Sequence, residues 1–123
     1  METRGSEKIH TGIIGGSLNN QWASKTHIPA LTRSASHEIT AIATSNMATA
    51  RESAAKLGVD HAFDDYRELV RSGNVDLVVV SVKVPHHYEM IKEAIAAGKH
   101  VYSEWPLTVT PEEAEELAEL ASV

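Results

Sequence analysis

The sequence predicts an α/β fold with a doubly wound parallel sheet, and two kinds of segment support this prediction. Two apolar, β-branched runs, at residues 9–14 and 75–82, are typical of central parallel strands, which are buried on both faces. Segments with helical periodicity alternate with these runs and with shorter strand candidates along the chain. Such alternation favours a parallel sheet with right-handed crossover connections.

The alternation predicts a Rossmann-like arrangement of about five strands. We place the strands at residues 9–14, 38–44, 61–63, 75–82 and 99–103. We place the helices at residues 21–34, 48–57, 64–71 and 85–97, with a last helix after Thr110. These elements form one domain over residues 8–123, preceded by a flexible N-terminus at residues 1–7.

Individual residues indicate where several of these helices begin or are interrupted. Pro29 should kink or divide the first helix, because proline lacks a backbone N–H donor. Asp64 and Asp65 place negative charge in the first turn of the third helix, where the helix dipole favours it. Thr110 is the predicted cap of the last helix, and Glu113 is its capping-box partner.

The composition excludes several classes of function. A formal net charge of −6 argues against direct nucleic-acid binding, because such proteins present a basic face to phosphates. The absence of cysteine excludes disulfides and cysteine-ligated metals. No apolar run approaches the roughly 18 residues of a membrane span, and the polar start lacks the apolar region of a signal peptide. We therefore expect a cytoplasmic protein without a membrane or nucleic-acid partner.

The turn after the first strand carries a weakened dinucleotide-binding motif. The usual Gly-x-Gly-x-x-Gly lets the backbone approach a pyrophosphate at a helix N-terminus. Here Gly15 and Gly16 are followed by Ser17 in the second glycine position and Asn20 in the third. The candidate phosphate-binding residues are therefore Gly15, Gly16 and Ser17. A turn with weak or lost cofactor binding is the open alternative.

No acidic residue ends the second strand, where Asp or Glu usually binds the ribose hydroxyls of NAD. Residues 43–46 read Ala-Thr-Ser-Asn. Loss of that carboxylate removes repulsion against a 2′-phosphate, so the sequence favours NADP over NAD if either binds. Ser45 and Arg51 are the candidate contacts, and a solvated helix position is the alternative for Arg51.

Another motif lies where the last predicted strand ends. Glu104, Trp105 and Pro106 resemble the Glu-Lys-Pro turn of the Gfo/Idh/MocA family of oxidoreductases, with Trp105 in place of the lysine. Residues 21–31 and 84–89 resemble the branch of that family that includes a galactose-pathway transcriptional repressor. Tryptophan cannot carry charge or transfer a proton as lysine does. The resemblance therefore implies a redox domain that is altered at its chemistry.

The resemblance covers the whole chain and implies the amino-terminal NAD(P)-binding domain of the family. Catalytic members add a carboxy-terminal α/β domain, which covers the nicotinamide and supplies the substrate site. We expect that domain to be absent, so that the fold is a truncated one. Its loss exposes apolar surface near the strand ends, and a large exposed apolar patch usually finds a partner. We therefore expect a homodimer.

The candidate catalytic and pocket residues follow from the same strand ends, because ligands bind there in open α/β sheets. The catalytic candidates are Lys83, His86, His87 and Glu104. The candidate pocket residues are Trp22, Tyr88, Tyr102 and Trp105. Packing, capping or solvent exposure is the alternative for each. His27 is expected to pack or hydrogen-bond locally, and the spacing of the histidines predicts no metal site.

Three functions stay open at this point. The first is a small enzyme, derived from an oxidoreductase, that performs non-redox chemistry such as isomerisation or cyclisation on a small molecule. We rank it first because the lysine and two glycines are missing together. The second is the cofactor domain of an NAD(P)-dependent oxidoreductase. The third is a non-catalytic module that senses a nucleotide or binds a partner protein.

Overall fold

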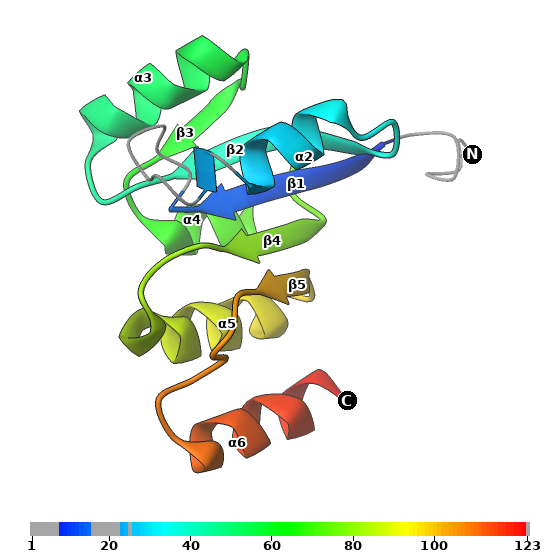
Figure 1. The fold of residues 1–123 in the computed structure, drawn as a ribbon, viewed down its shortest axis with the longest axis vertical. Helices are drawn as coiled ribbons and strands as arrows, with labels where there is room; N and C mark the ends of the chain where they lie inside the picture. The colour runs from blue at the N-terminus through cyan, green and yellow to red at the C-terminus, as the bar shows by residue number, and fades with distance from the viewer. Residues whose placement is uncertain (1–7, 16–22, 25, 123) are drawn as a thin grey trace.

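The computed structural model describes residues 8–15, 23–24 and 26–122, and it confirms the predicted sheet. Five parallel strands are hydrogen-bonded in the order β3-β2-β1-β4-β5 (Figure 1). The strands are β1 (Ile9–Ile14), β2 (His37–Ala43), β3 (His61–Phe63), β4 (Leu77–Val80) and β5 (His100–Ser103). The strand order reverses between β1 and β4, which is the topological switch point of a doubly wound sheet.

Helices cover both faces of this sheet (Figure 1). They are α2 (His27–Arg33), α3 (Met47–Leu57), α4 (Tyr66–Arg71), α5 (His87–Ala96) and α6 (Pro111–Ala121), with a 3₁₀ turn, η2 (Val84–His86), before α5. Alternate residues of a strand point to opposite faces. Accordingly Ile14 and Val80 join a core cluster with α4, α5 and α6, whereas Ile13 and Val79 pack with α2. Within the described residues, no helix has the length and apolar character that a membrane crossing requires.

The central strand is shorter than the predicted range of residues 75–82. The ladder between β4 and β1 ends at Val80, and single hydrogen bonds continue the pairing beyond both of its ends. The Asp76 N–H donates to the His10 carbonyl at 2.7 Å, and the Ser81 N–H donates to the Ile14 carbonyl at 3.0 Å. The run is buried at Val75 and from Val78 to Ser81, and regular strand pairing covers only its middle, Leu77–Val80.

Asp65 caps α4 instead of lying inside its first turn, so the predicted start of this helix is two residues early. The Asp65 Oδ1 accepts a hydrogen bond from the Arg67 N–H at 2.9 Å. This bond satisfies one of the N–H groups that a helix start leaves without a partner. Asp64 consequently lies on the loop between β3 and α4, at the carboxyl edge of the sheet.

Pro29 lies in the first turn of α2, where its missing N–H breaks no helical bond. Residues 23–24 are helical and Thr26 forms a turn, so the helix predicted over residues 21–34 is divided before Pro29. At α6, the Thr110 Oγ1 accepts from the Glu113 N–H at 3.2 Å, which confirms the predicted cap. The Glu113 Oε1 is buried without a hydrogen-bond partner among the described residues, so only this half of the capping box is seen.

Candidate functional site

A cavity of about 980 Å³ opens at the carboxyl edge of the sheet. Segments that follow all five strands contribute to its wall. The wall includes Ile14 and Gly15 at the end of β1, Ala43, Thr44 and Ser45 at the end of β2, Asp64 to Arg67 after β3, Ser81, Val82, Lys83, His86 and Met90 after β4, and Glu104 after β5. The cavity therefore lies at the switch point, where doubly wound sheets bind their ligands.

Gly15 is the residue that shapes the inner wall of this cavity. Its φ of +84° lies in the left-handed region, and its N–H donates to the Ala43 carbonyl at 2.8 Å. A Cβ at this position would collide with the Ser81 carbonyl oxygen and would lie 3.0 Å from the Val82 Cγ1. Only glycine lets the β1 turn approach β4 so closely. The predicted Gly16, Ser17 and Trp22 lie outside the described residues.

The end of β2 contributes hydroxyl groups and no acid, as the sequence indicates. Thr44 and Ser45 line the cavity, and the Thr44 hydroxyl donates to the Asn46 carbonyl at 2.7 Å. Asn46 caps α3 through a hydrogen bond to its side chain from the Thr49 N–H at 3.1 Å. Arg51, on α3, is not among the residues that line the cavity. The structure thus brings Ser45 into the site and leaves Arg51 outside it.

Tyr66 and Arg67 form a charged part of the wall that the sequence did not single out. The Arg67 guanidinium lies over the Tyr66 ring, 5.0 Å from its centroid, and 3.7 Å from the Asp65 Oδ1. Burial raises the pKa of Tyr66, an effect that the nearby Arg67 opposes. The phenol therefore stays protonated at neutral pH and keeps its donor hydrogen.

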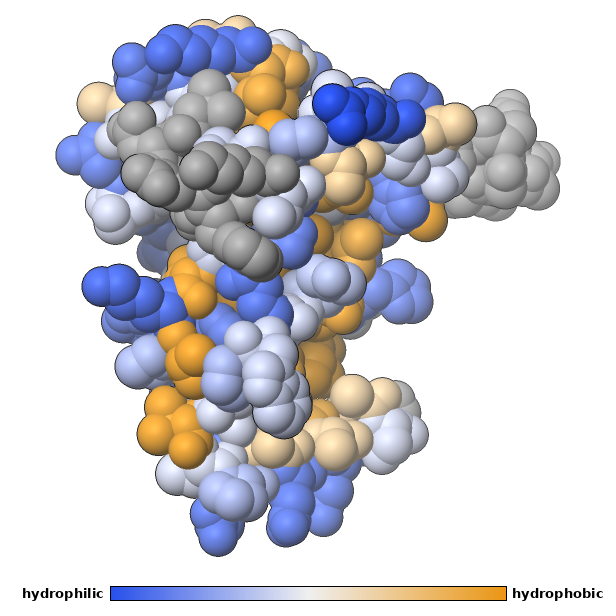
Figure 2. Space-filling model, in the orientation of Figure 1, coloured by the Kyte–Doolittle hydropathy of each residue, from blue (hydrophilic) through white to orange (hydrophobic). Residues whose placement is uncertain are grey.

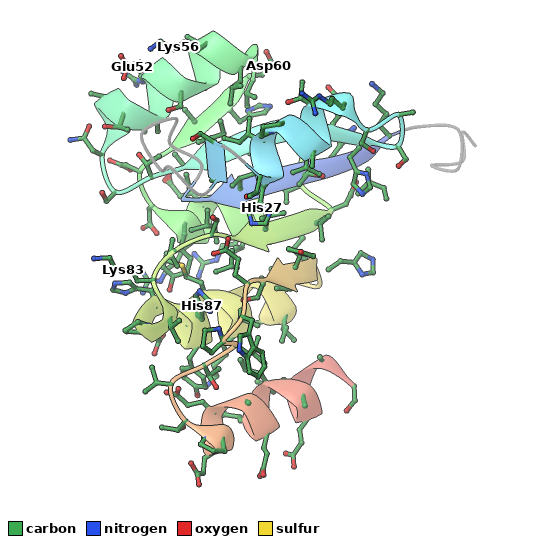
Figure 3. The ribbon with its side chains drawn as sticks, in the orientation of Figure 1. His27, Glu52, Lys56, Asp60, Lys83 and His87 are labelled. Atoms are coloured by element: carbon green, nitrogen blue, oxygen red, sulfur yellow. The ribbon has the colours of Figure 1, made fainter. Side chains whose placement is uncertain are left out.

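Lys83 and His86 are exposed and line the cavity on the side where the chain leaves β4. Lys83 stands immediately before η2, and His86 is its last residue. Figure 3 shows Lys83 on the loop between β4 and α5. The structure therefore brings together Lys83, His86, Ser45 and Gly15 around one cavity.

His87, the neighbouring candidate, is buried and points elsewhere (Figure 3). Its Nδ1 lies 3.0 Å from the Leu107 carbonyl oxygen, and its Nε2 lies 2.8 Å from the Val82 carbonyl oxygen. The ring thus joins the segment that leaves β4 to the segment before α6. His87 does not line the cavity, because both ring nitrogens face backbone carbonyls of the surrounding loops.

Glu104 lies at the edge of the cavity and is held by two polar neighbours. Its Oε2 lies 2.8 Å from the His27 Nε2 and accepts a hydrogen bond from the Ser81 hydroxyl at 3.4 Å. The His27 side chain is only 15% exposed. The expectation of a local role for His27 is wrong, because its partner is 77 positions away in the sequence. No local pattern signals a pair of this separation.

The aromatic candidates that the structure describes, Tyr88, Tyr102 and Trp105, lie outside the main cavity. His27, Tyr102, Glu104 and Trp105 line a second hollow of about 400 Å³, which shares Glu104 with the cavity. Trp105 is 90% exposed there, and the His27 and Tyr102 rings meet edge to face at 5.7 Å. Tyr88 belongs to neither hollow, because its hydroxyl donates to the Glu116 Oε2 on α6 at 2.8 Å.

The described residues contain no group of three His, Asp or Glu side chains that could hold a metal ion.

Comparison with known proteins gives this site a family context. Residues 9–122 match the family described as oxidoreductase family, NAD-binding Rossmann fold. The chain is 31% identical over 121 residues to the galactose/lactose metabolism regulatory protein GAL80 of Kluyveromyces lactis, covering 91% of this chain and 26% of that protein. It is 35% identical over 122 residues to the dehydrogenase aclE of Aspergillus oryzae, covering 94% of this chain and 33% of that protein.

Solved structures agree with this assignment. A 3-ketoreductase from Actinomadura kijaniata, in complex with TDP-benzene and NADP, matches with a TM-score of 0.86 and 33% identity over 94% of this chain and 35% of that chain. An NAD binding oxidoreductase from Klebsiella pneumoniae matches with a TM-score of 0.80 and 37% identity over 95% of this chain and 32% of that chain. The chain thus spans about a quarter to a third of the length of these relatives. It belongs to the Gfo/Idh/MocA oxidoreductase family and carries that family's NAD-binding Rossmann fold.

Proposed function

We propose that the cavity at the carboxyl edge holds a nicotinamide dinucleotide, NAD(H) or NADP(H), in a protein that has given up lysine-dependent chemistry. The observation that carries this proposal is the position of Gly15, whose missing side chain lets the β1 turn approach β4 beside the cavity. A tight turn at the end of the first strand is what the first glycine of a dinucleotide-binding motif provides.

The residues present fit such a group. Thr44 and Ser45 offer hydroxyls for a ribose, and the side chains of Val82 and Met90 offer apolar surface for a flat ring. A volume of about 980 Å³ lies at the upper end of the usual range for ligand pockets, which suits a large ligand. When bound, a nicotinamide dinucleotide supplies a hydride donor or acceptor.

The chain's own residues limit what can follow binding. Trp105 stands where the family turn has lysine, and its indole N–H can donate one hydrogen bond but cannot transfer a proton at neutral pH. Glu104, the other polar residue of that turn, is paired with His27. Binding without lysine-dependent turnover is therefore the role we assign. The similarity to GAL80, a regulatory protein, is consistent with it.

Calorimetric titration of the chain with NADH and NADPH tests the proposal. Ser45→Trp places a large ring at the cavity wall, on an exposed residue that no core packing depends on. Ala35→Trp is the matched control, because Ala35 is exposed near the other end of β2. We expect saturable binding that Ser45→Trp weakens at least about tenfold and Ala35→Trp leaves unchanged. If neither dinucleotide binds at millimolar concentration, the proposal is wrong.

A second candidate is non-redox acid–base chemistry on a small carbonyl compound, of the isomerase or cyclase type. It is favoured by Lys83 and His86, which place an ammonium group and an imidazole on the wall of one cavity. In such a reaction a base removes a proton next to a carbonyl and an acid returns one to another carbon. No external redox partner is needed.

Hydrogen exchange in D₂O separates this candidate from the first. If His86 removes a proton next to a carbonyl while the Lys83 ammonium donates a hydrogen bond to the carbonyl oxygen, NMR will show C–H replaced by C–D in a carbonyl substrate. We expect Lys83→Met or His86→Gln to abolish the exchange, while Lys56→Met, on the exposed face of α3, leaves it intact. Failure of a broad panel of carbonyl compounds to exchange above the buffer rate would exclude this chemistry.

A further inference from the structure

The ribose end of the cavity carries a carboxylate that comes from the neighbouring strand instead of from β2. The strands β2 and β3 pair in register up to Ala43 and Phe63, and the Thr44 N–H donates to the Phe63 carbonyl at 3.1 Å. The pairing therefore continues one step past the strands. Asp64, the residue after Phe63, lies beside the segment that holds Thr44 and Ser45.

Asp64 and Asp65 are adjacent in sequence but have different surroundings. Asp65 caps α4 and lies 3.7 Å from the Arg67 guanidinium, so its charge is balanced. Asp64 is exposed, lines the cavity, and takes part in no hydrogen bond or ion pair among the described residues. Arg67 also lines the cavity, but its charge is shared between Asp65 and the Tyr66 ring. Of the charged side chains Asp64, Asp65 and Arg67, only the Asp64 carboxylate has no oppositely charged partner among the described residues.

A carboxylate at this position can accept hydrogen bonds from the two hydroxyls of a ribose, and it repels a phosphate on the 2′ oxygen. We propose that Asp64 takes the role of the acid missing from β2 and makes the cavity prefer NAD(H) to NADP(H). This inference rests on the proposed function, and it reverses the preference that the end of β2 alone suggests. The preference is reversed because the pairing of β2 with β3 places an acid, Asp64, beside the end of β2, although β2 itself ends without one.

Binding of NADH and NADPH to the full chain, followed by cofactor fluorescence, tests the preference. We expect the unaltered chain to bind NADH at least about tenfold more tightly than NADPH. The ribose hydroxyls of NADH can donate hydrogen bonds to the Asp64 carboxylate, whereas the 2′-phosphate of NADPH is repelled by it. Asp64→Asn keeps the size of the side chain and removes its charge. It should reduce the ratio of the two affinities by about tenfold, mainly through tighter NADPH binding.

Asp60→Asn is the matched control. Asp60 is exposed at the opposite end of β3, and it lies away from Lys83 in Figure 3. It should leave the ratio of the two affinities unchanged.

Added salt should reduce the preference of the unaltered chain for NADH over NADPH, because salt screens repulsion between exposed charges. A helix-capping or packing role for Asp64 would show no such salt effect on the ratio.

The outcomes separate this inference from the proposed function. If both dinucleotides bind and Asp64→Asn leaves their ratio unchanged, the role of Asp64 is wrong and the cofactor site stands. A preference for NADPH in the unaltered chain would also overturn the role of Asp64. If neither dinucleotide binds, the proposed function fails and this inference fails with it.

Discussion

Glu104 is a catalytic candidate that contacts from other segments hold in place. Its carboxylate is bonded to His27 and Ser81, and its side chain is 20% exposed. Both contacts engage Oε2, and they fix the orientation of the side chain. Glu104, one of the catalytic candidates, therefore attaches the turn after β5 to α2 and to the end of β4.

A double-mutant cycle on His27 and Glu104 measures that structural role. We expect His27→Ala and Glu104→Ala each to lower the free energy of unfolding, with a coupling energy of about 1 kcal/mol between them. Urea denaturation of the four proteins gives the values. Additive effects of the two substitutions would show that the 2.8 Å contact contributes nothing to stability.

Trp105→Lys restores the residue type of the family turn and tests whether Trp105 belongs to the cofactor site. The side chain is 90% exposed, so the free energy of unfolding should change by less than about 0.5 kcal/mol. Trp105 does not line the cavity, so the dissociation constant for NADH should stay within about twofold. A large loss of NADH affinity would place the indole ring against the bound dinucleotide.

At the scale of elements, α6 is attached to α5 by a small polar network. The Tyr88 hydroxyl donates to the Glu116 Oε2 at 2.8 Å, and the Lys92 ammonium lies 3.1 Å from the same oxygen. Lys92 also donates to the Tyr88 hydroxyl at 3.2 Å. The hydrogen bond from Tyr88 and the bond from Lys92 hold the pKa of Glu116 below its ordinary value of 4.5. Three side chains thus link the last helix to the rest of the domain.

This network predicts a pH dependence of stability. The folded-state pKa of Glu116 is lowered, so its contribution is present above pH 4.5 and is lost as the pH falls through the lowered value. We expect Glu116→Gln to lower the Tm at neutral pH and to match the unaltered chain at strongly acidic pH. Glu115→Gln, on the exposed face of α6, is the control. Equal Tm differences at all pH values would contradict an ionic role for Glu116.

The sequence predicts a helix or strand correctly where residues close together in the sequence determine it. Examples are the apolar runs of β1 and β4 and the Thr110 cap of α6. The start of α4 was missed because either of two adjacent aspartates could cap it, and the cap bond of Asp65 decides between them. His27, Asp64 and Tyr66 acquire their roles from contacts or register between distant segments. Periodicity and spacing carry no information on such contacts.

At the scale of the whole molecule, hydrophobic surface gathers toward the β5 and α6 end. The exposed large apolar residues at this end are Tyr102, Trp105, Val109 and Leu120. Figure 2 shows orange surface in the half of the molecule that contains α5 and α6 in Figure 1, and further orange surface in the other half. β5 is also an edge strand of the sheet, and among the described residues no strand pairs with its outer side. Both features are typical of surfaces that associate.

The sequence predicts a homodimer, and we propose that the two copies associate through this end. Light scattering after size exclusion should give twice the mass of one chain at micromolar concentration. The double variant Val109→Glu and Leu120→Glu should shift the mass toward one chain, because it places charge on the apolar surface. Ile9→Glu, on a residue 41% exposed in β1, is the control. A single-chain mass for the unaltered protein would contradict the proposal.

Binding at the carboxyl edge of the sheet is the central claim, and a titration of the ¹⁵N-labelled chain with NADH, followed by NMR, tests it most directly. If the claim is right, saturable shifts will be confined to amides around the cavity, including Gly15, Thr44, Ser45, Asp64 and Ser81. Amides at the amino ends of the strands, such as those of Asp76 and His100, should not shift. Saturable shifts at those amino ends, or no shifts at millimolar NADH, would contradict the claim.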